Sequence, residues 1–400
     1  MSGRILPEVV GYLELNPKSA RLGRFGVGDE AAIYIHFPFC SHLCTYCDFD
    51  TFAGQERWMD SYLDAVVEQI RCSPRVQATS LYVGGGTPSL MSPARAAQLV
   101  TSCRERFHLA ADAETTIEAN PSGLTGKGLE GFRQAGFNRL SLGVQSTDRR
   151  LLRLLGRRHT PEEAEASVRA AREVGFDNVS IDLLYGVPVQ GQSVWETTLE
   201  TTIGWGVDHL SCYALTVEPG TPMERGVNRG ILQMPAEETV VEMYHTAVRL
   251  LGNAGYHRYE ISNWSRPGRE SAHNLTYWRN RPYLGIGAGA AGCWAGRRYK
   301  IVPMIEGYVE GVREGRVPLQ EEEAIHNRRA MSDSLILGLR LDEGVSVEEF
   351  VRRHGLRPED AFGEALEWGK GWGLLEREGD RIKLTERGIM VSNELFGRLL

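Results

Sequence analysis

Residues Ala32–Cys47 read AIYIHFPFCSHLCTYC, an apolar run that is followed at once by three cysteines. The run is rich in β-branched and aromatic residues, which is typical of a buried strand. Three residues separate Cys40 from Cys44, and two separate Cys44 from Cys47. The pattern therefore predicts a first strand that ends in a loop carrying three closely spaced thiols.

Thiolates are soft ligands that suit iron–sulfur clusters and zinc. A structural zinc ion would need a fourth ligand, which His36 or His42 could supply, but zinc thiolates usually come in separated pairs. Three ligands on a four-iron cube leave one iron open for a small molecule. The spacing favours a [4Fe–4S] cluster on Cys40, Cys44 and Cys47, with zinc as the alternative.

Short apolar runs alternate with longer amphipathic segments as far as about residue 215. This alternation predicts a parallel sheet with helices outside it. Six strand–helix units are too few for a closed eight-fold barrel, so we expect an α/β fold, a partial (β/α)6 barrel. The expected strands are Ala32–Phe37, Ser80–Val83, Thr115–Glu118, Arg139–Leu142, Asn178–Leu183 and His209–Leu215, and the expected helices include Met59–Ile70, Ala94–Arg106, Pro161–Val174 and Val194–Ile203.

Distinctive residues follow each expected strand at its carboxyl end, which is the rim where parallel barrels build their active sites. The second strand runs into Gly84-Gly85-Gly86-Thr87-Pro88, and bare glycine backbone can approach a ligand closely. A tight turn is the alternative explanation of these glycines. The later strands bring Glu118, Gln145, Asp182 and Ala214 to the same rim.

The pattern changes after about residue 220. Residues 256–294 are rich in aromatics, Gly and Asn, and we expect irregular chain lying over the barrel, followed by a polar helical segment over 306–327. Helices and then a hairpin with a Gly379-Asp380 turn predict a winged-helix shape at the C-terminal end. The expected division is an N-terminal extension (1–29), the barrel (30–255), a covering linker (256–327) and a C-terminal winged-helix-like domain (328–400).

The composition is that of an ordinary globular protein. The chain has 45 basic and 52 acidic residues, a net charge of −7, which gives no support for nucleic-acid binding. We see no apolar run long enough to span a membrane and no signal-peptide layout. The seven cysteines are an odd number, which argues against a disulfide framework. A cytoplasmic protein is therefore expected.

The cysteine spacing after a first strand resembles that of the radical S-adenosylmethionine superfamily. The resemblance implies that the open iron binds the amino and carboxylate groups of S-adenosylmethionine. An electron passed into the sulfonium then yields methionine and a 5′-deoxyadenosyl radical. It also implies that the backbone of Gly84-Gly85-Gly86 lies beside the methionine moiety.

Further motifs resemble the coproporphyrinogen III oxidase-like branch of that superfamily, from about residue 30 to the C-terminal domain. They are Tyr34–Cys40, Tyr46–Phe49, Gly84–Pro88, Glu118–Pro121, Leu142–Ser146, Leu155–Thr160 and Asp182–Gly186. By this resemblance Tyr34 and Tyr46 flank a first S-adenosylmethionine, which Gly85 and Glu118 also touch. The positions that would hold a second S-adenosylmethionine are Gly86, Thr87, Gln145, Arg157, Asp182 and Ala214.

Two kinds of protein in this branch are weighed. The oxidase decarboxylates two propionates of a porphyrinogen, and its motif carries a further cysteine two residues past the third, where this chain has Phe49. The HemW-type heme chaperones carry His-Asn-x-x-Tyr-Trp, which is similar to His273–Trp278. We expect a heme chaperone, with the oxidase as the alternative. Whether the chain cleaves S-adenosylmethionine is left open.

A heme iron needs an axial ligand, and neutral imidazole is the commonest one. His273 is therefore the candidate heme contact, with a packing role as its alternative and Cys293 as a soft alternative ligand. The aromatic residues of the motif could lie against the porphyrin, and Arg279 and Arg281 could pair with its propionates. The expected partners are heme and an acceptor protein, which could be at a membrane, and the chain is expected to be a monomer or a cluster-dependent dimer.

Overall fold

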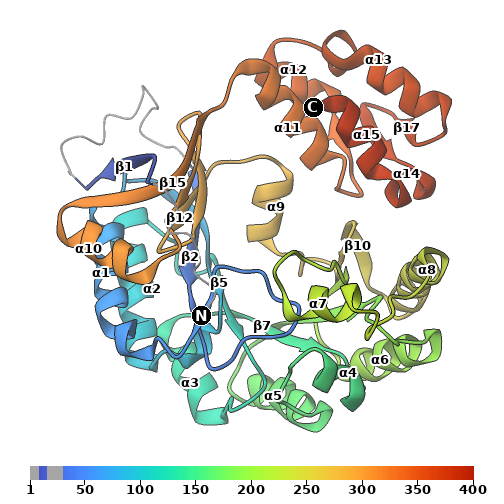
Figure 1. The fold of residues 1–400 in the computed structure, drawn as a ribbon. Helices are drawn as coiled ribbons and strands as arrows, with labels where there is room; N and C mark the ends of the chain where they lie inside the picture. Colours follow the sequence, from blue (N-terminus) through green and yellow to red (C-terminus); the bar gives the residue numbers. More distant parts are fainter. Residues whose placement is uncertain (1–8, 16–29) are drawn as a thin grey trace.

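The computed structural model describes residues 9–15 and 30–400, and within them one sheet has 13 strands in the order β1-β15-β14-β13-β12-β2-β5-β6-β7-β8-β9-β11-β10. Each of the six expected strands is present, and neighbours pair in parallel (Figure 1). The partial barrel is thereby confirmed. Its strands are β2 (Glu30–Phe37), β5 (Gln77–Gly85), β6 (Glu114–Ala119), β7 (Arg139–Gln145), β8 (Asn178–Tyr185) and β9 (His209–Ala214).

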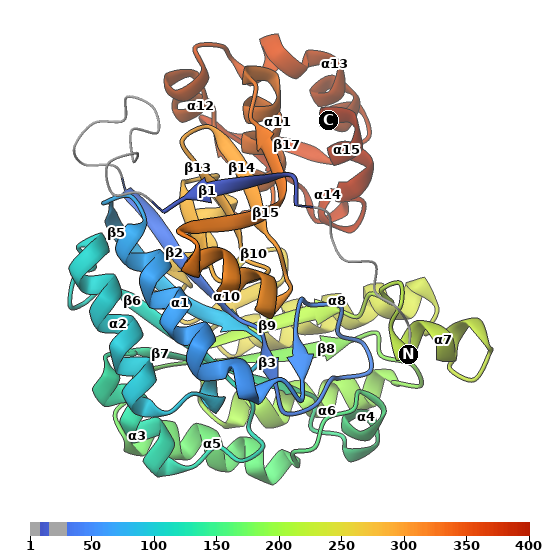
Figure 2. The same cartoon turned by 60° about the vertical axis from the view of Figure 1, so that its left-hand side comes forward.

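Helices cover the outer face of this sheet (Figure 2). The side chains on the outer face of the strands, among them Ile33, Leu81 and Ile117, point toward these helices and are completely buried in the core. Alternate residues of the same strands face the barrel lumen, because side chains of a strand point to opposite faces in turn. The helices that follow the strands are α1 (Met59–Cys72), α2 (Pro93–Phe107), α3 (Gly126–Ala135), α4 (Arg149–Leu154), α5 (Pro161–Glu173), α6 (Gln192–Gly204), α7 (Pro222–Asn228) and α8 (Glu237–Asn253).

Local signals explain where these helices begin. In α5 the Thr160 hydroxyl accepts from the backbone N–H of Glu163 at 3.2 Å, and the Glu163 carboxylate accepts from the backbone N–H of Thr160 at 2.7 Å. Pro161 occupies the first turn, where its missing N–H costs nothing. This reciprocal cap satisfies two of the unpaired donors at the helix start, so the start of α5 follows from the sequence.

The expectation of irregular chain over residues 256–294 is wrong. β10 (His257–Glu260) and β11 (Asn263–Ser265) extend the sheet beyond β9, and β12 (Tyr283–Ile286) pairs in parallel with β2. The expected helix over 306–327 ends early, because α10 (Ile305–Arg313) gives way to a strand. The remaining elements of this region are α9 (Ala272–Trp278), β13 (Ala291–Trp294), β14 (Arg297–Ile301) and β15 (Arg316–Ala324), and β15 pairs with β1 (Gly11–Glu14).

The C-terminal domain combines helices with a small sheet of order β16-β18-β17, in agreement with the winged-helix expectation. The Gly379-Asp380 turn joins β17 to β18 as predicted, with a positive φ of 57° at Gly379. α9 lies between the barrel and this domain (Figure 1). The elements are α11 (Asn327–Gly338), β16 (Val345–Ser346), α12 (Val347–His354), α13 (Pro358–Gly371), β17 (Leu375–Glu378), β18 (Arg381–Leu384), α14 (Glu386–Met390) and α15 (Ser392–Leu399).

Among the helices of residues 9–15 and 30–400, none combines the length and the apolar character that crossing a membrane requires.

Candidate functional site

A cavity of about 280 Å³ lies at the carboxyl ends of the parallel strands. Cys40, Cys44 and Cys47 line it from the loop that follows β2. The exposed side chain of Phe49 also lies on its wall. The structure brings most of the other predicted contacts to this cavity, namely Tyr46, Gly85, Gly86, Thr87, Glu118, Gln145, Arg157, Asp182 and Ala214. Asn120 and Gly143, which belong to the expected rim motifs, line it as well, and so does Ser141, which sequence reasoning did not select.

Gly86 is needed where β5 packs against the cysteine loop. Its backbone N–H donates to the carbonyl of Phe37 at 2.7 Å, and the N–H of Thr87 donates to the carbonyl of Phe39 at 2.8 Å. A Cβ atom at Gly86 would lie 2.5 Å from the Phe39 carbonyl oxygen, which is closer than such atoms can approach. The glycine therefore has a packing reason of its own, beside any contact with a ligand.

Two donors point at the thiols. The Thr87 hydroxyl donates to Cys40 Sγ at 3.7 Å, and Arg157 Nη1 donates to Cys44 Sγ at 3.6 Å. Burial raises the pKa of Cys47 to about 11, so a bound metal group is what would keep this thiol deprotonated. Hydrogen bonds to sulfur also tune iron–sulfur clusters. The donor set therefore fits a cluster held by the three cysteines.

The zinc alternative finds no support in the geometry. Zinc ligands must lie about 2.0–2.3 Å from one ion, and no three His, Cys, Asp or Glu side chains of the described ranges converge in this way. The ring of His36 is already engaged, by the Tyr34 hydroxyl at 2.9 Å and the carbonyl of Asp50 at 3.0 Å. Through its bond to Asp50, His36 holds the cysteine loop in place.

Carboxylates and a strained residue occupy the floor of the cavity. Glu118 accepts from the Tyr82 hydroxyl at 2.7 Å and from the Gly85 N–H at 3.0 Å, and burial raises its pKa to about 7. Asp182 accepts from Ser141 at 3.4 Å, and burial raises its pKa too. Gln145 is 9% exposed with φ of 68°, a conformation that residues other than Gly rarely adopt. Such strain concentrates at functional sites.

Tyr34 is not brought to this cavity. It lines a different one, of about 410 Å³, together with Tyr277 and Tyr283. Its ring centroid lies 6.2 Å from that of Tyr82 in the barrel lumen. Tyr34 therefore stands one layer below the cysteine loop, apart from the other predicted contacts.

His273 is buried in the lumen, with 1% of its surface exposed. Its Nδ1 is hydrogen-bonded to the Ser80 hydroxyl and its Nε2 to the Tyr277 hydroxyl, both at 2.9 Å. The ring stacks on Tyr82 at 5.0 Å. Burial, and next the nearby Arg139 cation, lower its pKa to about 3, so the imidazole is neutral. An iron ion could bind it only after one of the two hydroxyls had moved.

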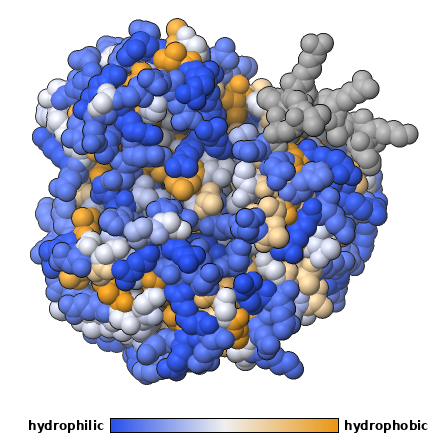
Figure 3. Space-filling model, turned by 180° about the vertical axis from the view of Figure 1, so that it is seen from behind, coloured by the Kyte–Doolittle hydropathy of each residue, from blue (hydrophilic) through white to orange (hydrophobic). Residues whose placement is uncertain are grey.

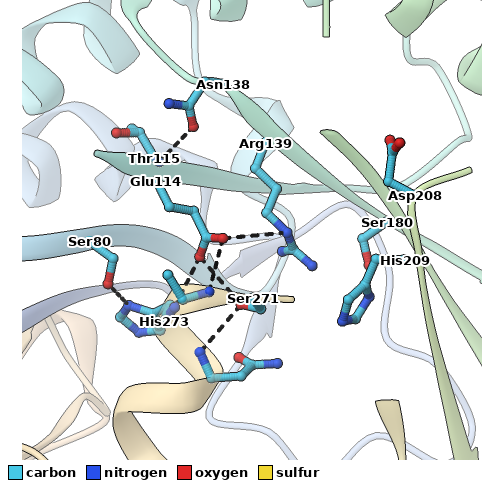
Figure 4. Close-up of polar contacts among 12 residues, drawn as sticks. Ser80, Glu114, Thr115, Asn138, Arg139, Ser180, Asp208, His209, Ser271 and His273 are labelled. Atoms are coloured by element: carbon cyan, nitrogen blue, oxygen red, sulfur yellow. Dashed lines mark hydrogen bonds and ion pairs between the residues drawn. The ribbon is translucent and has the colours of Figure 1, made fainter. Parts of the chain in front are cut away.

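A network that sequence reasoning missed fixes α9 to the barrel (Figure 4). The Glu114 carboxylate accepts from the backbone N–H groups of Ala272 and His273, each at 3.0 Å, and from the Ser271 hydroxyl at 3.3 Å. Arg139, 2% exposed, lies 3.9 Å from the same carboxylate. Anionic oxygens at a helix start satisfy its free donors. The sequence carries one signal for this network, because a charged residue stands at the start of each of two buried strands, Glu114 in β6 and Arg139 in β7.

A larger cavity, of about 860 Å³, lies at the opposite end of the strands. It is bordered by the amino ends of β2 and β5, by α9, by the β13–β14 hairpin and by the C-terminal domain. Its size lies within the roughly 300–1,000 Å³ of small-molecule sites. Seen from behind, the surface is hollowed between the C-terminal domain and the barrel, and apolar residues gather there (Figure 3).

Comparison with known proteins identifies the superfamily and the fold of this chain. The Radical SAM superfamily matches residues 34–201, and the HemN C-terminal domain matches residues 325–391. The solved structure of Escherichia coli coproporphyrinogen III oxidase (HemN), a radical SAM enzyme, superposes with a TM-score of 0.81. The match covers 98% of this chain and 96% of that chain at 22% identity, and it shows a shared fold.

Sequence relatives narrow the class. The heme chaperone HemW of Lactococcus lactis is 34% identical over 92% of this chain and 96% of its own length. That of Bacillus subtilis is 34% identical, with coverages of 92% and 98%. The mitochondrial radical S-adenosyl methionine domain-containing protein 1 of Danio rerio is 33% identical over 91% of this chain and 84% of its own. The chain belongs to the HemW family of the radical SAM superfamily.

Proposed function

We propose that this protein is a heme chaperone, which binds heme and passes it to an acceptor protein in the cytoplasm or at a membrane surface. The observation that carries the proposal is the position of α9, the helix that holds the His273–Trp278 motif. This helix borders the cavity of about 860 Å³, beside the C-terminal domain. A motif that marks the heme chaperones thus lies against a cavity of suitable size. Membership of the HemW family supports the same function.

We further propose that Cys40, Cys44 and Cys47 hold a [4Fe–4S] cluster with S-adenosylmethionine beside it. The bound cluster supplies an open iron and an electron. The chain's own groups suit the nucleotide, because the carboxyl groups of Glu118 and Asp182 face the same cavity as the thiols and can balance its ammonium and sulfonium charges. The backbone of Gly85 and Gly86 adds close contacts without side chains.

Heme titration tests the main proposal. Purified protein is titrated with hemin, and the Soret band is followed by difference spectroscopy. We expect saturable binding of one heme per chain and its loss to added apomyoglobin, used as a generic acceptor. Binding that never saturates, or that bovine serum albumin reproduces at equal concentration, would remove the basis of the chaperone function.

The oxidase alternative is tested separately. Phe49 occupies the position where the oxidase motif has its further cysteine, and its side chain is 63% exposed on the wall of the cluster cavity. Anaerobically reconstituted protein is incubated with coproporphyrinogen III, S-adenosylmethionine and a reductant. We expect no protoporphyrinogen. Its formation at a rate above that of a Cys44→Ser control would establish the oxidase reaction instead.

A further inference from the structure

The cavity of about 860 Å³ is lined by apolar and by cationic residues, and of its two carboxylates Asp333 is paired with Arg298 and Arg329 while Glu30 lies at the start of β2. Ala31, Leu275, Pro282, Trp294 and Ile325 line this cavity, an arrangement that suits a flat hydrocarbon ring system. The exposed residues Arg279, Arg281 and Arg353 also line the cavity. Arg279 and Arg281 follow the end of α9, and Arg353 lies on α12. Heme has the same division, since its porphyrin is apolar and its two propionates are anionic.

The arginines are arranged to receive carboxylates. Arg279 and Arg281 pair with Glu343 and Glu349 at 3.1 Å and 2.6 Å. All four side chains are well exposed, and exposed pairs of this kind contribute only about 0–1 kcal/mol, so a ligand carboxylate can replace the glutamates. Arg353 donates to the backbone carbonyls of Arg279 and Asn280, at 3.3 Å and 2.6 Å. These two bonds hold its guanidinium at the cavity edge.

Cys293 is the iron-ligating group that faces this space. It is half-buried on β13, and it lines both this cavity and the neighbouring one of about 410 Å³. Histidine, cysteine, methionine and tyrosine are the side chains that ligate heme iron in proteins. Cys293 is the only residue of these four types among the described residues that line the larger cavity. His273 lines neither of the two cavities, and both of its ring nitrogens are already hydrogen-bonded.

We propose that the larger cavity is the heme site, that Cys293 provides the axial ligand, and that Arg279, Arg281 and Arg353 receive the propionates. The inference rests on the proposed heme-carrying function and adds the site to it. The Sγ–Fe(III) bond forms as the thiol proton passes to solvent, and the iron keeps its oxidation state. His273 is then a positioning residue, which ties α9 to β5 through its hydrogen bond to Ser80.

This arrangement suits release as well as capture. A single ligand from the chain leaves the opposite axial position of the iron free for a side chain of the acceptor. When the acceptor's ligand has bound, the Cys293 thiolate takes up a proton and the Sγ–Fe(III) bond breaks. Propionates held at an exposed edge are released without the barrel having to open.

The ligand is tested by hemin titration of four proteins that carry their cluster: wild type, Cys293→Ser, His273→Gln and Cys72→Ser. Cys72 is another half-buried thiol, at the end of α1 and outside the cavity. We expect the thiolate signature of ferric heme in the electron paramagnetic resonance spectrum of wild type and Cys72→Ser. Cys293→Ser should lose that signature and bind at least roughly tenfold more weakly, and His273→Gln should keep it.

The carboxylate contacts are tested with hemin dimethyl ester, in which both propionates are blocked. Arg281→Ala should weaken hemin binding roughly tenfold, the loss expected for one hydrogen bond to a charged group, and should leave binding of the ester unchanged. Arg297→Ala, an exposed arginine on β14 that does not line the cavity, is the matched control. Equal losses for hemin and its ester would show that Arg281 does not contact the propionates.

The possible failures are distinguishable. If wild type shows no saturable binding, the proposed function and this site fall together. If wild type binds, Cys293→Ser keeps both affinity and spectrum, and His273→Gln loses them, the heme-carrying function stands and the assignment of Cys293 is overturned. Thermal unfolding of each variant identifies any that has failed to fold, and Cys293→Ala then replaces Cys293→Ser.

Discussion

At the scale of single residues, the pKa of His273 is determined by its surroundings. Its ring is 1% exposed and lies near the buried Arg139, which is why its pKa falls to about 3. An exposed histidine titrates near 6.5. Between these two values the unfolded chain binds a proton that the folded chain does not. The contribution of the neutral His273 to the free energy of unfolding is therefore fully present above about pH 6.5, and it is lost as the pH falls toward 3.

We expect His273→Gln to flatten this acid dependence. The wild-type free energy of unfolding should fall by up to about 1.4 kcal/mol per pH unit from this one group, and the variant should lack that part of the slope. Urea unfolding between pH 7 and pH 4 measures it. His245→Gln, at an exposed position on α8, is the control. Equal slopes for wild type and His273→Gln would mean that the histidine is already protonated in the folded protein.

Gly86 shows a steric limit at the same scale. A Cβ there would meet the carbonyl oxygens of Phe39 and Phe37 at 2.5 Å and 2.8 Å. We expect Gly86→Ala to cost about 1–3 kcal/mol, as other overpacked sites do, and to lower the iron bound per chain after reconstitution. Gly204→Ala, at an open helical position on α6, should lower neither quantity. An unaltered iron content in Gly86→Ala would show that the cysteine loop can move away.

At the scale of elements, α9 depends on one carboxylate from another strand. Glu114 at the start of β6 accepts from the N–H groups of Ala272 and His273, and it lies beside Arg139. Short helices have little stability of their own, so α9 is held by this contact and by its packing.

We expect Glu114→Gln to destabilise the protein by about 3–5 kcal/mol, because it leaves the buried Arg139 without its counter-ion. The amide protons of 272–278 should then exchange faster in hydrogen-exchange mass spectrometry. Glu165→Gln, at an exposed position of α5, should change neither quantity. Protection of α9 as strong in Glu114→Gln as in wild type would show that packing alone holds this helix.

At the scale of the whole molecule, the barrel separates two sites. The cavity lined by the three cysteines lies at the carboxyl ends of the strands. The cavity of about 860 Å³, our proposed heme site, lies at the amino ends of β2 and β5, and no residue lines both. The link between them runs through Glu118, Tyr82 and His273, by one hydrogen bond and one ring stack. These two contacts form the route between the sites, and His273 itself lines neither cavity.

We therefore expect heme affinity to be almost independent of the cluster. Cys44→Ser should abolish the iron–sulfur absorbance and change the dissociation constant for hemin by less than about fivefold, the lower end of typical coupling between sites. Hemin titration of the two proteins side by side measures this. A larger change would show that the two sites are coupled.

Local sequence patterns were sufficient for the barrel and for the cluster cavity. Six strands, their helices and the cysteine loop were predictable because a strand and its carboxyl-end motif are adjacent in the chain. Parallel strands then bring those motifs to one rim, which is how Cys40, Glu118 and Asp182 could be placed together. The C-terminal hairpin was predictable for a similar reason, since its Gly-Asp turn is a local signal.

Only the tertiary structure determined the region around α9 and the cavity of about 860 Å³ beside it. β10, β11 and β12 are three or four residues long, and pairing with β9 and β2 makes them strands. The motif at 273–278 identified the family, but the surroundings of His273 come from Ser80, Glu114 and Arg139, distant in sequence. The same holds for Cys293, which lines one cavity with Arg279, Arg281 and Arg353 only because the C-terminal domain lies against α9 and the β13–β14 hairpin. Burial and hydrogen-bond partners depend on such contacts, and no local pattern encodes them.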